Sequence, residues 1–201
     1  MLQYHTKDNL EIGIDEAGRG SFFGPVCVAA VIWPNEEPDD TMVIRDSKKL
    51  SEKKRNILRE YIEENAIAYS VKFIDNDVID KINILKATMK GMHECIDDIR
   101  KTIEIDTLLI DGNQFDIYMD HNFECINHHC VVGGDDKYKC IAAASILAKT
   151  YHDEYITDLV KNNPSLEQYG LLTNKGYGTK VHREAIKDFG LTTYHRKSFK
   201  I

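Results

Sequence analysis

Apolar residues follow two different periods along this chain, and the change between them predicts strands alternating with helices. Near the start, Leu10, Ile12 and Ile14 recur at every second position, as on a strand over 10–15. An almost uninterrupted apolar run over 25–33 is typical of a central strand that is covered on both faces. Further strands are predicted over 67–74, 107–110 and 123–132.

Helices are indicated where apolar residues recur three and four positions apart. They are predicted over 52–64, 76–100, 138–161 and 180–188. Ser51 can cap the first of them, Asn83 is expected to break the second, and Pro164 follows the end of the third. A loop is expected over 34–40. Strands first, then strands mixed with helices, predict an α/β layered domain.

The size of the chain suits one core with a small appendage. It has 201 residues, of which 42% are hydrophobic. We expect a main domain over 1–164 and a small helical extension over 165–201. No apolar run reaches 18 residues, and the segment 1–9 is polar, so neither a membrane span nor a signal peptide is expected. The five scattered cysteines favour reduced thiols in a cytoplasmic compartment.

Charge is unevenly distributed. The net charge is −7, yet the segment 45–60 carries +4 and the segment 174–201 carries +5, which leaves −16 on the rest. A strongly acidic body argues against a generally adhesive nucleic-acid binder. Two basic segments within it either form a local phosphate-binding surface or are ordinary solvated helix faces.

Two adjacent carboxylates, Asp15 and Glu16, come directly after the first apolar strand. Neighbouring residues on a strand point to opposite faces, so both can reach one point only if the strand bends or ends there. Gly18 and Gly20, on either side of Arg19, permit such a bend. The arrangement suits a divalent metal beside a loop that approaches a phosphate or ribose closely.

Two further carboxylates could join this pair. Asp111 follows a buried strand and precedes a glycine, and Asp153 shares one face of a helix with Ser145 and Lys149. Each also has an ordinary explanation, as a turn residue or a solvated helix residue. Four carboxylates at one point would repel one another unless divalent cations were bound. All-oxygen ligands favour Mg²⁺ or Mn²⁺, and two such ions can hydrolyse a phosphodiester.

Six motifs, in order, are spread over nearly the whole chain. They are DEAGRGSFFGPV at 15–26, DSKKLS at 46–51, LLIDG at 108–112, AAASILAK at 142–149, and NKGYGTKVHREAI at 174–186 followed by HRKSF at 195–199. Together they resemble the ribonuclease HII family. The resemblance implies a ribonuclease H-like α/β fold, with a central mixed sheet flanked by helices and a small C-terminal helical lobe.

The activity that the resemblance implies is cleavage of RNA in RNA/DNA hybrids and incision 5′ of single ribonucleotides in duplex DNA, leaving 3′-hydroxyl and 5′-phosphate ends. By motif match, a two-metal site for Mg²⁺ or Mn²⁺ would use Asp15, Glu16, Asp111 and Asp153. The expected partners are hybrid and ribonucleotide-containing duplexes. A monomer is expected, with no membrane contact and no clamp-binding tail. Roles in repair and in primer removal both stay open.

The resemblance also implies a set of substrate-binding residues. The backbone of Gly18, Arg19 and Gly20 would read the ribose 2′-hydroxyl, the group that distinguishes RNA from DNA. Tyr177 would pack on the following deoxyribose, where a 2′-hydroxyl would crowd its ring. The remaining candidates, which include the cations expected to contact phosphates, are Lys48, Lys49, Ser145, Lys149, Lys175 and Arg196.

The chain departs from the family pattern at three positions. His152 stands where Arg often precedes the aspartate of the long helix, Gly133 where Lys is usual, and Asn174 where His is frequent. Two other functions remain possible: a ribonuclease HIII-like nuclease and a hybrid-binding module without catalysis. A zinc site in the segment 125–130, which holds two cysteines and two histidines, would need an unusual spacing.

Overall fold

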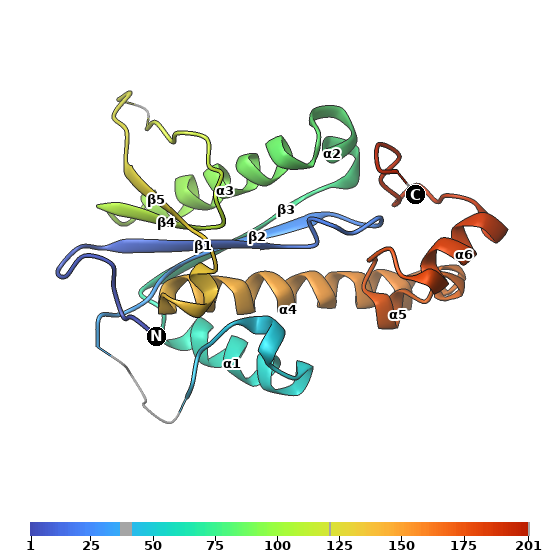
Figure 1. Cartoon of the computed structure of the whole chain (residues 1–201), viewed down its shortest axis with the longest axis horizontal. Coiled ribbons are helices and arrows are strands. Elements are labelled where there is room, and N and C mark those ends of the chain that lie inside the picture. Colours follow the sequence, from blue (N-terminus) through green and yellow to red (C-terminus); the bar gives the residue numbers. More distant parts are fainter. Residues whose placement is uncertain (37–41, 121, 201) are drawn as a thin grey trace.

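A five-stranded mixed sheet forms the centre of the computed structural model, which describes residues 1–36, 42–120 and 122–200 (Figure 1). The strand order is β3-β2-β1-β4-β5. The strands are β1 (Glu11–Ala17), β2 (Val26–Ile32), β3 (Ala68–Ile74), β4 (Thr107–Asp111) and β5 (Asn127–Val131). β1, β2 and β3 pair antiparallel, whereas β1, β4 and β5 run parallel. The predicted α/β fold with a mixed sheet is confirmed.

Helices cover both faces of this sheet. The α-helices are α1 (Glu52–Asn65), α2 (Asn76–Ile82), α3 (Ile84–Arg100), α4 (Lys139–Asn162), α5 (Leu171–Asn174) and α6 (Lys180–Phe189), and the 3₁₀-helices are η1 (Ser47–Lys49), η2 (Gly134–Asp136) and η3 (Pro164–Tyr169). Figure 1 shows α3 on one face and α4 on the other, with α1 outside α4. No helix in the described part of the chain is long and apolar enough to cross a membrane.

The alternation of side chains explains this layering. Ile12 and Ile14 of β1 pack in the core under α3, whereas Ala29 and Val31 of β2 pack in the core under α4. Every residue of β2 is buried, as expected of a strand covered on both faces. Gly13 lets α4 lie directly on β1, because a Cβ atom there would be 2.2 Å from the backbone carbon of Cys140.

Two predicted elements differ in extent from the observed ones. β1 continues beyond the predicted end at Asp15 through Glu16 to Ala17, because pairing with β2 extends to the register Ala17–Cys27. β5 begins only at Asn127, because Asp120 accepts backbone hydrogen bonds from Asn122 and Glu124 and holds the preceding residues in a turn. The loop expected over 34–40 falls partly on 37–41, outside the described residues.

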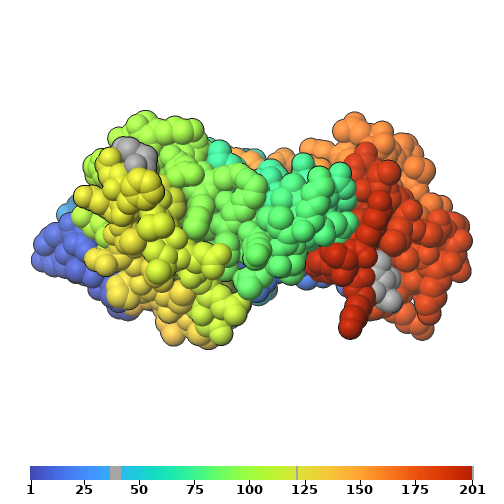
Figure 2. All heavy atoms as spheres, turned by 90° about the horizontal axis from the view of Figure 1, so that it is seen from above, coloured from blue at the N-terminus to red at the C-terminus, as the bar shows by residue number. Residues whose placement is uncertain are grey.

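The C-terminal residues gather at one end of the molecule (Figure 2). η3, α5 and α6 share an apolar core with the last turns of α4 and with Phe22 and Phe23 from the segment after β1. In this core, Ile156 and Val160 of α4 are fully or almost fully buried. We call residues 165–200 the C-terminal lobe. The division at residue 164 stays a prediction, since this apolar core contains side chains from both sides of it.

Asp98 joins α3 to β3 and makes stability depend on pH. It accepts hydrogen bonds from Lys101, Lys72 and Ser70, which hold its pKa below the usual range. A lowered pKa contributes stability above the unfolded value of about 4 and loses it as the pH falls toward the folded value. Because the carboxylate is partly exposed, we expect Asp98→Asn to cost only about 0.5–1 kcal/mol at pH 7. In urea titrations, the difference in the free energy of unfolding between Asp98→Asn and wild type should become smaller below about pH 4. A difference that stays constant with pH would contradict this assignment.

Candidate active site

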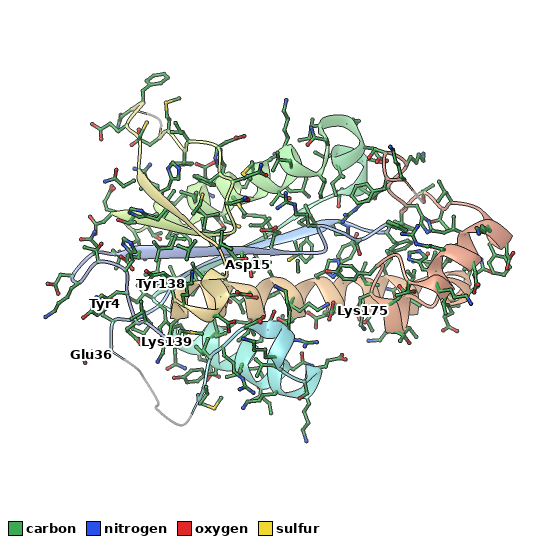
Figure 3. All side chains as sticks on the ribbon, viewed as in Figure 1. Tyr4, Asp15, Glu36, Tyr138, Lys139 and Lys175 are labelled. Carbon is green, nitrogen blue, oxygen red and sulfur yellow. The ribbon has the colours of Figure 1, made fainter. Side chains whose placement is uncertain are left out.

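Three carboxylates converge at one edge of the sheet. Asp15 lies near the end of β1, Asp111 is the last residue of β4, and Asp135 lies in η2, shortly after β5. One oxygen of each lies within 4.8 Å of the other two. Since β1, β4 and β5 run parallel, their carboxyl ends meet at this edge. Figure 3 shows Asp15 between the sheet and the first half of α4.

Hydrogen bonds fix the orientation of these side chains. Gly134 donates its backbone N–H to Oδ1 of Asp111 at 2.7 Å, which joins the end of β4 to η2. Asp15 accepts from the backbone N–H of Glu16 at 2.7 Å and from the hydroxyl of Ser145 on α4. Ser145 in turn lies 2.9 Å from the hydroxyl of Ser47, so η1 is held against the same point.

The cluster carries more negative charge than its neighbours balance. Burial raises the pKa of Asp15 well above its ordinary value, and the charges of Glu16 and Asp111 raise it further. Burial also raises the pKa of Glu16, against the opposing charge of Arg19. The pKa of Asp135 is raised by burial and by Asp111, although Lys48 opposes this at 3.4 Å.

A divalent cation fits this donor set. Only carboxylate oxygens are grouped here, and hard ions such as Mg²⁺ and Mn²⁺ prefer such ligands. A bound cation would also relieve the mutual repulsion that raises the pKa of Asp15. Asp15, Asp111 and Asp135 are therefore the side chains placed to hold it, and Glu16 lines the cleft beside them.

Asp135 was missed by the sequence analysis, and Asp153 lies elsewhere than expected. The carboxylate of Asp153 pairs with Lys149 at 2.8 Å and with Arg55 at 3.7 Å. Burial alone would raise its pKa, but His152 and Lys149 outweigh this, and the pKa is lowered. Asp153 is thus already neutralised by cations, in a groove between α1 and α4, and does not join the group of three aspartates.

A cleft of about 320 Å³ opens beside the aspartates. It is lined by Asp15, Glu16, Ala17, Ser47, Lys48, Ser145, Lys149 and Tyr177. Tyr177 belongs to the C-terminal lobe, so this lobe supplies one wall of the cleft. Lys48 is the cation that extends furthest into solvent here, with 75% of its side chain exposed. A polyanionic strand in the cleft would therefore meet Lys48 beside the carboxylates.

Residues Gly18, Arg19 and Gly20 follow β1, and we call them the glycine loop; this loop is hydrogen-bonded to Tyr177. Gly18 donates its backbone N–H to the Tyr177 hydroxyl at 3.1 Å. It adopts a φ of +80°, and a Cβ atom there would lie 2.3 Å from Nε2 of His152, so only glycine fits. Arg19 pairs with Glu16 at 3.3 Å and remains 45% exposed. Gly20 has open space around it apart from the Tyr177 ring.

Arg196 does not fit the expected role of a substrate contact. It is fully buried, and its guanidinium donates to the backbone carbonyls of Arg19, Gly24 and Pro25 at 2.8–3.0 Å. Burial lowers its pKa to about 10, so it stays charged at neutral pH. Because every donor nitrogen is engaged inside the protein, Arg196 fixes the shape of the glycine loop from within.

The other expected substrate residues have different surroundings. Lys49 is held by Asp136, and Lys175 donates to the hydroxyl of Thr157 toward the far end of α4 from Asp15 (Figure 3). Lys149 lines the cleft while pairing with Asp153. Ser145 is buried and supports Asp15. Among the expected substrate cations, Lys48 contacts the acidic cluster through Asp135, and Lys149 lines the same cleft.

The three departures from the family pattern have local explanations. His152 is fully buried and fills the space beside Gly18. Gly133 takes a left-handed φ of +64° at the start of η2. Asn174 donates to the carbonyl of Tyr169 and accepts from the N–H of Gly176, which shapes the turn before Tyr177.

The zinc hypothesis finds no support within the described ranges. Cys125 and Cys130 are both exposed, free thiols. The group of three aspartates is the one set of three or more potential metal ligands found among residues 1–36, 42–120 and 122–200.

Comparison with known proteins agrees with this geometry. The family model "Ribonuclease HII" matches residues 12–201. The chain is 50% identical to a ribonuclease HII of Parabacteroides distasonis over 199 residues, covering 99% of this chain and 94% of the relative. A ribonuclease HII of Cytophaga hutchinsonii is 45% identical to this chain, over 99% of this chain and 93% of the relative.

Two solved structures share the fold. A ribonuclease HII from Archaeoglobus fulgidus, solved in complex with PCNA, gives a TM-score of 0.73 at 25% identity, with 94% of this chain and 92% of that chain covered. A Bst ribonuclease HIII solved with Mn²⁺ gives a TM-score of 0.72 at 22% identity, with 99% of this chain and 68% of that chain covered. The sequence match over nearly the whole length decides the assignment: the chain belongs to the ribonuclease HII family of RNase H endonucleases.

Proposed function

We propose that this enzyme cleaves the RNA strand of RNA/DNA hybrids and incises duplex DNA on the 5′ side of a single ribonucleotide. The observation that carries the proposal is the convergence of Asp15, Asp111 and Asp135 beside a cleft that also contains Tyr177. The acidic cluster supplies the chemistry of phosphodiester hydrolysis, and the glycine loop and Tyr177 supply a means of recognising the junction between ribose and deoxyribose.

Metal binding is assigned to the carboxylates that the fold brings together. Asp15, Asp111 and Asp135 would hold two divalent ions, with Glu16 as an additional ligand from the same cleft. The chemistry that bound ions would supply here is activation of a water molecule and stabilisation of the departing 3′ oxygen, which would leave 3′-hydroxyl and 5′-phosphate ends. Lys48 would hold a strand phosphate next to the carboxylates, and its contact with Asp135 keeps it there.

The glycine loop would read the ribose through its backbone. Gly18 and Gly20 present no side chain at this point, so a sugar can approach the peptide groups directly. The 2′-hydroxyl both donates and accepts hydrogen bonds, which suits recognition by backbone groups. Arg196 holds the carbonyl of Arg19 in place, so the loop is preorganised before substrate arrives.

Tyr177 would read the next sugar. Its hydroxyl is fixed by Gly18, so the ring is held at the wall of the cleft. A deoxyribose can pack against this ring, whereas a 2′-hydroxyl at the same position would crowd it. The enzyme would therefore prefer a ribose followed by a deoxyribose, and we place it in the removal of ribonucleotides from DNA.

Replacing Tyr177 by Ala is expected to reduce kcat/KM about tenfold or more on a duplex with one ribonucleotide, because apolar packing of a large side chain contributes roughly 1.5–3 kcal/mol when it is fully buried. Long hybrids offer many registers, so the loss on them should be smaller. Tyr177→Phe is the matched control, since it keeps the ring and removes only the hydroxyl bond to Gly18. Equal losses on both substrates would contradict the junction role.

The direct test of the proposed function is cleavage of a labelled duplex that carries one ribonucleotide, with Mg²⁺, Mn²⁺ or chelator present. Metal-dependent incision 5′ of the ribonucleotide supports the proposal. Cleavage of long hybrids alone would favour an HIII-like specificity, which the shared fold with the Bst enzyme keeps as the second candidate.

A further inference from the structure

Two buried histidines of the C-terminal lobe, His182 and His195, contact each other outside the cleft. Both are 0% exposed, and their Nε2 atoms lie 3.1 Å apart. The ring of His195 packs on Phe23 and Tyr169, with centroids 5.0 and 5.1 Å away. Two ring nitrogens at this distance can share a hydrogen bond only if one carries a proton and the other does not.

Backbone partners determine which nitrogen carries the proton. Nδ1 of His195 lies 2.9 Å from both the backbone N–H and the hydroxyl of Thr192. The N–H can only donate, so we assign Nδ1 as an acceptor and place the proton of His195 on Nε2. Nε2 of His182 must then accept. The other nitrogen of His182, Nδ1, lies 3.0 Å from the carbonyl oxygen of Tyr177. Because a carbonyl oxygen can only accept a hydrogen bond, the proton of His182 lies on Nδ1.

The result is a one-way chain of hydrogen bonds that ends on Tyr177. It runs from Thr192 through His195 and His182 to the Tyr177 carbonyl, while the Tyr177 side chain is bound by Gly18. This chain of hydrogen bonds links two segments that both bind Phe22, close after the glycine loop. The backbone carbonyl of Gly176 accepts the N–H of Phe22, and Arg196 donates its backbone N–H to the carbonyl of Phe22.

We propose that His182 and His195 are positioning residues that hold Tyr177 in its junction-reading place. The inference rests on the proposed contact between Tyr177 and the substrate sugar. Neither histidine belongs to the acidic cluster or lines the cleft, and the hydrogen bonds between them reach the cleft at the backbone of Tyr177. The expected consequence is a loss of substrate affinity, with the chemical step preserved, when the chain of hydrogen bonds is broken.

The chain of hydrogen bonds requires the rings of His182 and His195 both to be neutral. A second proton on either ring would place two N–H groups face to face. Burial and the neighbouring His182 lower the pKa of His195 to about 4. Burial also lowers the pKa of His182, and Arg183 on the same helix acts in the same direction, against hydrogen bonds to Tyr177 and Gly176. The uncharged ring of Tyr169 faces the pair from η3. The arrangement is therefore complete at neutral pH.

Nitrogen NMR of the ring tautomers tests the chain without any activity assay. Long-range proton–nitrogen spectra of the full-length protein at pH 7 should show His182 protonated at Nδ1, the less common form of a free histidine, and His195 protonated at Nε2. Finding His182 protonated at Nε2, or either ring doubly protonated, would overturn the proposal.

Kinetics test the link to Tyr177. On the single-ribonucleotide duplex, His182→Leu should raise KM about five- to tenfold with kcat nearly unchanged, the size expected for one lost hydrogen bond. His182→Asn places an amide N–H near the Nδ1 position and should restore most of the affinity. A KM that rises equally in both variants would indicate general disruption of the lobe and overturn the specific role.

A double-mutant cycle separates this inference from the proposed function. If Tyr177→Ala alone weakens binding and His182→Leu adds nothing further in that background, the histidines act through Tyr177. If Tyr177→Ala has no effect, the proposed junction contact itself fails. If Tyr177→Ala weakens binding, and His182→Leu weakens binding in that background as much as it does in wild type, the histidines act by another route and the inference is wrong.

Discussion

Asp111→Asn is expected to reduce cleavage by roughly 10³-fold, the scale seen when a charge-stabilising group is removed from an active site. Asp111 belongs to the acidic cluster, and one oxygen each of Asp15 and Asp135 lies within 4.8 Å of one of its oxygens. An amide in its place carries no charge and binds a divalent ion poorly. Cleavage of the single-ribonucleotide duplex under saturating Mg²⁺ measures the loss, and near-normal turnover would refute the assignment.

The fold should survive this substitution, which makes the result interpretable. An Asn at position 111 still accepts the hydrogen bond from Gly134 through its carbonyl oxygen. It also removes one of the charges that raise the pKa of Asp15, so the metal-free variant should have a Tm no lower than wild type. Mg²⁺ should raise the Tm of wild type and leave the variant unchanged. Asp188→Asn, at an exposed position of α6, is the matched control for loss of one charge.

Asp135→Asn and Asp153→Asn should have opposite effects on activity and stability. Asp135 belongs to the acidic cluster, so its substitution should reduce cleavage by at least about 10²-fold. Its ion pair involves Lys48, whose side chain is 75% exposed, so stability should change little. Measured together, activity and Tm decide which carboxylate completes the metal site.

Asp153→Asn, by contrast, should act mainly on stability. The side chain is only 10% exposed and neutralises both Lys149 and Arg55, so an amide leaves these two cations without their carboxylate. We expect a loss of about 1–3 kcal/mol in the free energy of unfolding, with activity reduced less than tenfold. An inactive Asp153→Asn variant with unchanged Tm, beside an active Asp135→Asn variant, would restore the assignment made from the sequence.

The strands and helices were predictable because local patterns and tertiary burial agree. The continuous apolar run of β2 and the alternation in β1 are visible without any knowledge of the partners. The end of β1 was not visible, since Glu16 and Ala17 remain in the strand through pairing with β2. In the same way, the start of β5 depends on a turn that Asp120 organises by hydrogen bonds from two later residues.

The site was predictable where a carboxylate lies at or near the carboxyl end of a strand. Asp15 and Asp111 fit that rule, and Asp135 would have fitted it if the weak strand before Gly133 had been treated as a parallel neighbour of β4. Asp153 is a candidate from its helix face, which Lys149 does share, and only the motif match assigns it to the metal site. The periodicity of a helix gives a direction around its axis, but it does not say which position along the axis lies beside the sheet edge.

The burial of Arg196 gave no local signal at all. An arginine near other cations normally indicates a phosphate contact, and only the arrangement of three backbone carbonyls around its guanidinium shows otherwise. These carbonyls lie more than 170 residues away in the sequence.

That separation has a consequence for how the enzyme matures on the ribosome. The three aspartates are all synthesised by residue 135, so the acidic centre can assemble while the C-terminal lobe is still missing. The carbonyls of Arg19, Gly24 and Pro25 gain their guanidinium partner only when residue 196 has emerged. On the proposed function, a nascent chain would complete its acidic cluster before the glycine loop gains its internal support, and selectivity for a ribonucleotide would be the last property to be established.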